Sequence, residues 1–279
     1  MHILMRFVPF LLLVWSVPSG AAGQSSALAG KNVLVYTRNG EGFVHDNVAV
    51  SAQAIADLGK KFGFAVDVSD EAAVFTEEKL KKYHFVVFAN TNNEVFDNDQ
   101  QRLAFRRFIQ AGGGMVGIHS ALGTERDWAW FNQLKGGSFT WHPKKQDLYL
   151  TRIVRHESTE GTPADWEWSD ECYFSKTYYP GIRTLMVAHL DRLDPADQKA
   201  VREHRTSFDN LHPVVWHQGF DGGVMWMTTL GHDKEAYTDP VFLTHLTGGL
   251  EYVASQVTEL DYAKAYARDF DEGVRFGKK

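Results

Sequence analysis

The chain has 279 residues, 44% of them hydrophobic, which is enough to bury a full core in one domain. Its 29 basic and 35 acidic residues give a formal net charge of −6 and form no basic stripe, so nucleic acid is not expected as a partner. The single cysteine, Cys172, excludes an intramolecular disulfide in any compartment.

The first residues have the three parts of a secretory signal peptide. A positive start, Met1–Arg6, precedes the apolar run Phe7–Val17 and the small-residue exit Pro18–Gly23. The apolar run is shorter than the roughly 20 residues that span a bilayer. We therefore predict a signal peptide over residues 1–23, a mature protein that starts near Gln24 in the periplasm or outside the cell, and no membrane contact after cleavage. The alternative is an uncleaved N-terminal anchor.

Strand and helix patterns alternate through the first half of the mature chain. Short apolar runs closed by turn residues indicate strands, and longer segments with helical spacing separate them. The expected strands are Asn32–Thr37, Phe64–Val68, Phe85–Asn90 and Met115–Ile118, and the expected helices are Asp46–Phe62, Thr76–Lys81 and Asn98–Ala111. This alternation predicts one α/β domain over residues 24–279, with a mostly parallel sheet and helices on both faces.

The pattern becomes irregular between Leu122 and Thr184, where tryptophans are spaced among Gly, Pro and charged residues. This composition indicates long loops near the functional edge of the sheet. Within and after these loops we expect a short helix near Trp128–Leu134, strands at Asp147–Val154 and Leu185–His189, a β-hairpin of Pro213–Gln218 with Gly223–Leu230, and a helix at Pro240–Ser255.

Four histidines share a position relative to the predicted strands. His45, His119 and His232 each follow a strand, and His142 lies in the loop after the short helix. Because ligands bind beyond the carboxyl ends of parallel strands, these four imidazoles are expected to meet around one cleft. The alternative for each is an ordinary solvated or hydrogen-bonded loop histidine. Histidines without this placement are interpreted as structural or surface residues: His84, His156, His189, His204, His212 and His245.

Two familiar motifs are absent around His119. The glycines at 112–114 precede a strand instead of joining a strand to a helix, so they do not form a phosphate loop and no nucleotide cofactor is expected. Ser120 lacks the flanking glycines of a nucleophile elbow, since Ile118 and Leu122 occupy those positions. A serine hydrolase is therefore disfavoured.

Asp170 and Glu171 form an adjacent acidic pair among aromatic residues. Such carboxylates can ligate a metal, act as a general base or accept hydrogen bonds from sugar hydroxyls. The alternative is a helix N-cap or an exposed turn. The neighbouring Cys172 is more typical of a buried thiol than of a ligand.

Several of these segments together resemble the trehalose-utilisation (ThuA-like) family. They appear in family order and cover about residues 32–255: GFVH at 42–45, GGGMVGIHSA at 112–121, LKGGSFTWHP at 134–143, SDECY at 169–173, PVVW at 213–216 and TLGH at 229–232. The resemblance implies a fold similar to class I glutamine amidotransferases, a flavodoxin-like three-layer sandwich. Those enzymes carry a nucleophilic cysteine at the elbow where this chain has His119, so glutaminase activity is not expected.

The resemblance also implies a function in sugar metabolism. Family members resemble partners of sugar dehydrogenases, which implies a small sugar substrate, such as a trehalose derivative or another glycoside in its 3-keto form. The expected activity is that of a metal-assisted hydrolase or lyase with a divalent ion, zinc being favoured. The alternative is a non-catalytic sugar-binding accessory protein.

Individual residues receive the following expected roles. The metal ligands are His45, His119, His142 and His232; the catalytic residues are His119, Glu171 and Asp170; and the sugar contacts are His45, Trp141, Trp168 and Trp216.

Overall fold

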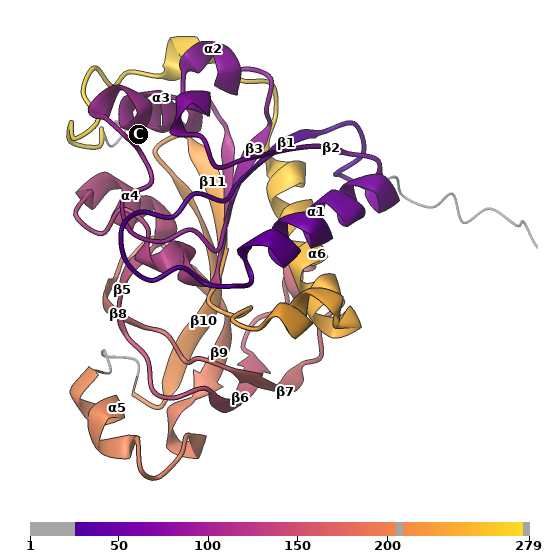
Figure 1. The fold of residues 1–279 in the computed structure, drawn as a ribbon, viewed down its shortest axis with the longest axis vertical. Coiled ribbons are helices and arrows are strands. Elements are labelled where there is room, and N and C mark those ends of the chain that lie inside the picture. The colour runs from indigo at the N-terminus through magenta and orange to yellow at the C-terminus, as the bar shows by residue number, and fades with distance from the viewer. Residues whose placement is uncertain (1–25, 205–208, 276–279) are drawn as a thin grey trace, which may run out of the picture.

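A computed structural model describes residues 26–204 and 209–275. Its main element is a nine-stranded sheet with strand order β2-β1-β3-β4-β11-β10-β9-β6-β7 (Figure 1). No helix within these two ranges is long and apolar enough to cross a membrane. The predicted signal peptide over residues 1–23 lies outside the described residues.

One half of the sheet is parallel and matches the expected alternation of strands and helices. Its five strands are β1 (Asn32–Tyr36), β2 (Ala65–Ser69), β3 (Phe85–Ala89), β4 (Gly114–Ile118) and β11 (Gly223–Thr228). The helices are α1 (Val48–Phe62), α2 (Glu77–Leu80), α3 (Asp99–Gln110), α4 (Ala129–Lys135) and α6 (Pro240–Gln256). Every residue of β3 and β4 is buried, as expected for apolar strands covered on both faces.

The other half of the sheet is antiparallel, which corrects the prediction of a mostly parallel sheet. Its strands are β10 (Leu211–Phe220), β9 (Arg183–His189), β6 (Gln146–Arg152) and β7 (Asp165–Asp170). The change of direction begins at the expected β10–β11 hairpin. Asp221 and Gly222 both have positive φ, 48° and 100°, so a two-residue turn reverses the chain there.

Four further elements were not predicted. They are β7, a separate two-stranded sheet of β5 (Gly137–Trp141) with β8 (Phe174–Tyr178), and α5 (Gln198–His204).

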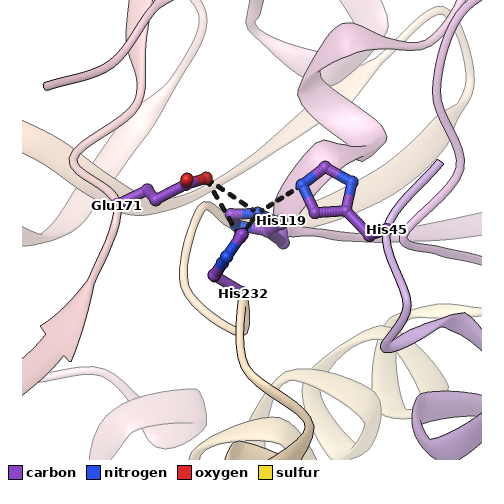
Figure 2. Close-up of side chains that lie close together, drawn as sticks. All are labelled: His45, His119, Glu171 and His232. Carbon is purple, nitrogen blue, oxygen red and sulfur yellow. Dashed lines mark hydrogen bonds and ion pairs between the residues drawn. The ribbon is translucent and has the colours of Figure 1, made fainter. Parts of the chain in front are cut away.

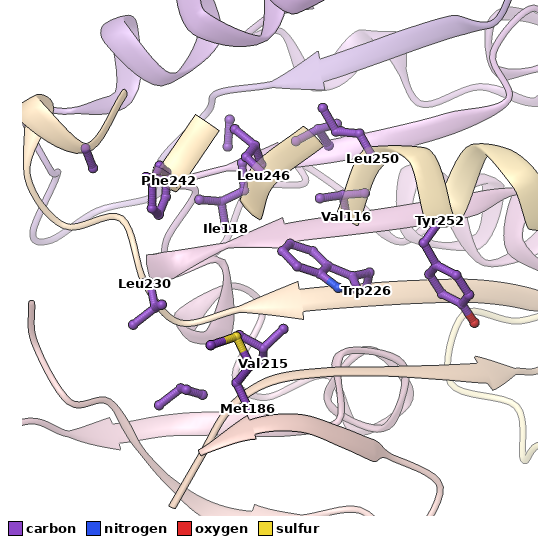
Figure 3. Close-up of a cluster of buried hydrophobic side chains, with 14 of the residues drawn as sticks. Val116, Ile118, Met186, Val215, Trp226, Leu230, Phe242, Leu246, Leu250 and Tyr252 are labelled. Atoms are coloured by element: carbon purple, nitrogen blue, oxygen red, sulfur yellow. The ribbon is translucent and has the colours of Figure 1, made fainter. Parts of the chain in front are cut away.

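Two hydrophobic clusters cover the two faces of the parallel strands. On β1, Val33 and Val35 belong to one cluster and Leu34 and Tyr36 to the other, because successive side chains of a strand point to opposite faces. Helices α1 and α6 contribute to the first cluster, and α3 and α4 to the second. In Figure 3, α6 lies over side chains of β4 and β11, with Trp226 at the centre. This packing fixes the strand ends at which the histidines lie.

Candidate metal centre

Four side chains meet at the carboxyl edge of the parallel strands: His45, His119, Glu171 and His232 (Figure 2). Each offers one potential ligand atom, and all four atoms lie within 4.8 Å of one another. His45 follows β1, His119 follows β4 and His232 follows β11. Glu171 directly follows β7. A surface hollow of about 780 Å³ beside the β10–β11 turn lies at the opposite edge and contains none of them.

The spacing of these atoms fits a small divalent ion. His119 Nε2 lies 3.3 Å from His45 Nε2, 3.4 Å from His232 Nδ1 and 3.6 Å from Glu171 Oε2. Glu171 Oε2 lies 3.0 Å from His232 Nδ1. Ligands at about 2.0–2.1 Å from a tetrahedral zinc ion are about 3.3–3.4 Å from one another. Three imidazoles and one carboxylate are also a donor set that zinc accepts.

His119 is held rigidly in the form that binds metal. Its Nδ1–H donates to the Thr229 carbonyl over 2.8 Å, which leaves the Nε2 lone pair facing the cluster. The backbone turns sharply here, with φ of +49°, and a Cβ at Gly117 would collide with Met227 on the adjacent strand. Burial, with the nearby His45, holds the pKa of His119 well below its usual value, so its imidazole is neutral.

His45 and Glu171 are also electrostatically suited to a cation, whereas the contact with Glu171 raises the pKa of His232 above its usual value. Burial, followed by the charge of His232, lowers the pKa of His45 to about 4. Burial acts to raise the pKa of Glu171, but the contact with His232 and the charge of His142 outweigh it and hold this pKa below its usual value. Glu171 Oε2 is buried and lies against the ring nitrogens of His119 and His232 without a well-aligned hydrogen bond to either. A bound cation would satisfy this oxygen, so the residues present fit a divalent metal.

Comparisons with known proteins agree with this fold. A model of the ThuA family, described as trehalose utilisation, matches residues 32–253. The chain belongs to the ThuA family. The resemblance predicted from the sequence segments is thereby confirmed. No significant match exists among curated proteins.

Solved structures of ThuA-like proteins from Bacteroides uniformis and Parabacteroides merdae superpose with TM-scores of 0.66 and 0.60. Both are 20% identical to this chain and cover 88% of it, and the matches span 99% and 100% of their own chains. A cytoplasmic protein from Salmonella typhimurium gives a TM-score of 0.56 at 11% identity, covering 80% of this chain and 99% of that one. At these identities the likeness concerns the fold alone.

In this ThuA-family chain Asp170 holds the site together and does not face it, which corrects its expected catalytic role. Its Oδ2 accepts hydrogen bonds from the Gly231 N–H and the Trp168 indole, over 2.7 and 2.8 Å. Its Oδ1 accepts from the N–H groups of Glu171 and His232, over 2.8 and 3.3 Å. Burial raises the pKa of Asp170 to about 6. With both oxygens occupied by these donors, Asp170 positions its neighbours.

Asp170→Asn is expected to weaken metal binding by about 10- to 100-fold. The amide nitrogen cannot accept hydrogen bonds, so one side of the carboxyl would lose either the Gly231 N–H and the Trp168 indole or the N–H groups of Glu171 and His232. Chelator competition measures the affinity, and Asp165→Asn, at an exposed position of the same strand, is the matched control. Equal affinities for Asp170→Asn and wild type would contradict the positioning role.

His142 lies beside the group of four but is not one of its members, and Glu171, expected to be catalytic, is a member instead. The ring of His142 lies at the mouth of the site, with its side chain 34% exposed. Its Nδ1 contacts the Pro143 carbonyl over 2.8 Å and lies 3.5 Å from Glu171 Oε1. It therefore borders the cluster from the solvent side.

The three tryptophans expected to contact a sugar are already packed against protein. Trp216 is fully buried, and its indole donates to the Lys135 carbonyl over 2.8 Å. Trp168 stacks on Phe242, with ring centroids 5.6 Å apart, and Trp141 stacks on His204 at 4.4 Å. Trp216 cannot contact a ligand, and the stacked faces of Trp141 and Trp168 are not available to one. The contact expected for Trp216 is therefore corrected, whereas the contacts expected for Trp141 and Trp168 stay predictions.

Two residues of the site were missed at the sequence level. The Tyr173 hydroxyl lies 3.3 Å from His45 Nε2, and burial holds its pKa well above the usual value, so it keeps its proton. Asn47 donates from Nδ2 to the carbonyls of Gly231 and His232, over 2.8 and 2.7 Å. The SDECY segment gave a signal for Tyr173, whereas nothing in the sequence distinguished Asn47 from any residue at a helix start.

Proposed function

We propose that this ThuA-family chain is a metal-dependent lyase or hydrolase that acts on glycosides oxidised to a ketone at carbon 3, such as a trehalose derivative. The observation that carries the proposal is the convergence of three imidazoles and Glu171 at the strand ends. Membership of a trehalose-utilisation family supports the sugar substrate. These four residues would hold a divalent ion, zinc in our proposal, which would polarise the keto oxygen if it accepted that oxygen as an additional ligand. A sugar dehydrogenase would supply the ketone.

The reaction follows from the acidity of the substrate. A ketone at carbon 3 acidifies the proton on carbon 2, so a base in the site can remove it. The electron pair of that bond then forms a double bond between carbons 1 and 2. The glycosidic bond at carbon 1 breaks, and its oxygen leaves with both electrons and takes up a proton. Addition of water to the double bond would complete a hydrolysis.

His142 is our candidate for the group that moves this proton. Glu171 has its carboxylate among the donor atoms, which leaves His142 as the nearby imidazole outside the group of four. Because Nδ1–H donates to the Pro143 carbonyl, Nε2 carries the free lone pair. A base at the mouth of the site can accept the carbon 2 proton and return it to the departing oxygen.

His142→Gln is expected to lower kcat by about 100-fold or more while the bound metal is retained, because general acid–base groups typically contribute that much. His189→Gln is the matched control, since His189 lies in the antiparallel half and contacts Thr151. Kinetics and metal content are measured on the same samples. Loss of metal together with activity in His142→Gln would instead make His142 a ligand, as the sequence indicated.

The proposed function itself is tested with purified protein and a 3-keto disaccharide. We expect about one divalent ion per chain, turnover that stops when a chelator removes it, and recovery when zinc is returned. Protein that carries no metal and turns over no substrate would contradict the proposal. If that protein still binds the parent sugar, the sugar-binding accessory role becomes the better description.

The proposal also covers the layer arrangement of the fold and the location of the protein. The order of the parallel strands, β2-β1-β3-β4-β11, with helices packed against both faces, supports a flavodoxin-like three-layer arrangement. The pattern of residues 1–23 supports export to the periplasm or the outside of the cell.

A further inference from the structure

We propose that Phe43 and Arg126 form a binding subsite for the second ring of a disaccharide, beside the metal cluster. This inference rests on the proposed function and deepens it, because it names a two-ring substrate and the residues that would distinguish it from a single sugar.

Phe43 is the most exposed of the large hydrophobic residues in the described part of the chain, with 66% of its surface accessible. A single exposed apolar side chain is common on proteins. This one, however, lies against the candidate site: its ring centroid is 4.8 Å from that of His45, in an edge-to-face arrangement. Phe43 thus presents open aromatic surface beside the cluster, unlike the fully buried Trp216.

Arg126 is an exposed cation held in place by neutral groups. Its two terminal nitrogens donate to Asn92 Oδ1 and Asn93 Oδ1, over 2.9 and 3.0 Å, and its guanidinium lies 5.6 Å from the centroid of the Phe139 ring. No carboxylate of the described residues forms an ion pair with it. Arginine has five N–H donors in a planar fork. The donors that the two amides leave free are suited to a pair of neighbouring sugar hydroxyls.

The side-chain amide of Asn92 connects Arg126 to the Phe43 backbone. Asn92 accepts from Arg126 through Oδ1 and donates through Nδ2 to the Phe43 carbonyl over 3.1 Å. Glycine makes this close packing feasible at two positions. A Cβ at Gly123 would lie 2.9 Å from an Arg126 nitrogen, and one at Gly42, where φ is +128°, would lie 2.8 Å from Asn93 Nδ2. The chain therefore builds this arrangement from several independent contacts.

The position of Arg126 indicates which ring it would contact. The Phe139 ring, over which the guanidinium lies, is 4.4 Å from the Tyr173 ring, and that ring is 4.3 Å from His119. Two aromatic rings thus separate Arg126 from the cluster. A ring that contacts Arg126 would lie next to the reacting ring, not over the histidines. An aromatic face and fixed donors are together the chemistry that recognises a pyranose ring.

The test compares a disaccharide with a monosaccharide on the zinc-loaded full chain. Calorimetry would measure the affinities of trehalose and methyl α-glucoside for wild type, Phe43→Ala and Arg126→Gln. We expect each variant to lose about tenfold in affinity for trehalose, as the loss of one such contact implies, with methyl α-glucoside nearly unchanged. Val68→Ala and Arg155→Gln change exposed residues outside the proposed subsite, with exposures of 52% and 88%, and should leave both affinities unchanged.

The other outcomes would contradict either the proposed subsite or the proposed function. Equal losses for both sugars, no loss for either, or a wild type that binds neither sugar would overturn the subsite. Metal-loaded, active protein without a preference for trehalose would sink the subsite alone. Metal-free, inactive protein that still shows the preference that depends on Phe43 and Arg126 would sink the proposed function and retain the subsite.

Discussion

His119→Ala is expected to abolish binding of the proposed metal and to lower turnover of a 3-keto disaccharide by roughly 100-fold or more. His119 Nε2 is the atom from which the other three donors lie 3.3 to 3.6 Å away, so its loss leaves them without a common centre. The fold should persist, because histidine already bears most of the cost of a φ of +49°, so alanine adds little backbone strain there. Metal analysis, kinetics and circular dichroism together measure these effects.

His189→Ala provides the control for this substitution. It removes an imidazole that contacts Thr151 in the antiparallel half of the sheet, so metal content and turnover should both stay at wild-type values. Unchanged turnover in His119→Ala would end the case for metal-assisted catalysis and place the sugar-binding role ahead. Loss of secondary structure in His119→Ala would instead show that the residue supports folding.

The parallel half of the fold could be predicted because its signals are local. The runs in β1, β3 and β4 are continuous and apolar, which is typical of strands buried on both faces. The same inference gave three of the four clustered donors. Since parallel strands end at one edge, residues that follow them in sequence, such as His119 and His232, must lie close in space.

The antiparallel half depends on contacts that the sequence displays less clearly. In β7, Trp166 and Trp168 alternate with acidic residues, which is a strand pattern, but the Gly and Pro residues around them favour a loop. The sequence also does not show which of Asp170 and Glu171 faces the site. Successive side chains near a strand end point in opposite directions, so one of the two must face away from the site. The hydrogen bond from the Gly231 N–H shows that Asp170 is the residue that faces away from the site.

Aromatic residues show the same limit. Trp216 and Phe43 both lie in segments that resemble the family, and nothing local states which is covered. Trp216 is fully buried and donates a hydrogen bond to the Lys135 carbonyl at the end of α4, whereas Phe43 is exposed next to His45. Exposure at a site therefore has to be observed, because it depends on elements distant in sequence.

Trp226→Ala is expected to lower the free energy of unfolding by about 3–5 kcal/mol, the usual cost of removing a large buried aromatic side chain. Trp226 is fully buried in the centre of β11, beneath α6 (Figure 3). The helix backbone lies directly on the indole, since a Cβ at Gly249 would come within 2.5 Å of its Cε3 atom. Its Nε1–H also donates to Ser158 Oγ over 3.2 Å, so the substitution removes a buried hydrogen bond as well.

Urea unfolding followed by circular dichroism would measure the change, with Val68→Ala as the control. Val68 is 52% exposed on β2, so its truncation should stay within about 0.5 kcal/mol of wild type. Trp226→Phe should fall between the two, because it keeps most of the contact with α6 but not the hydrogen bond to Ser158. A loss below about 1 kcal/mol for Trp226→Ala would mean that α6 moves to fill the vacated volume. That result would contradict the expectation that the contact between Gly249 and the indole holds α6 in place.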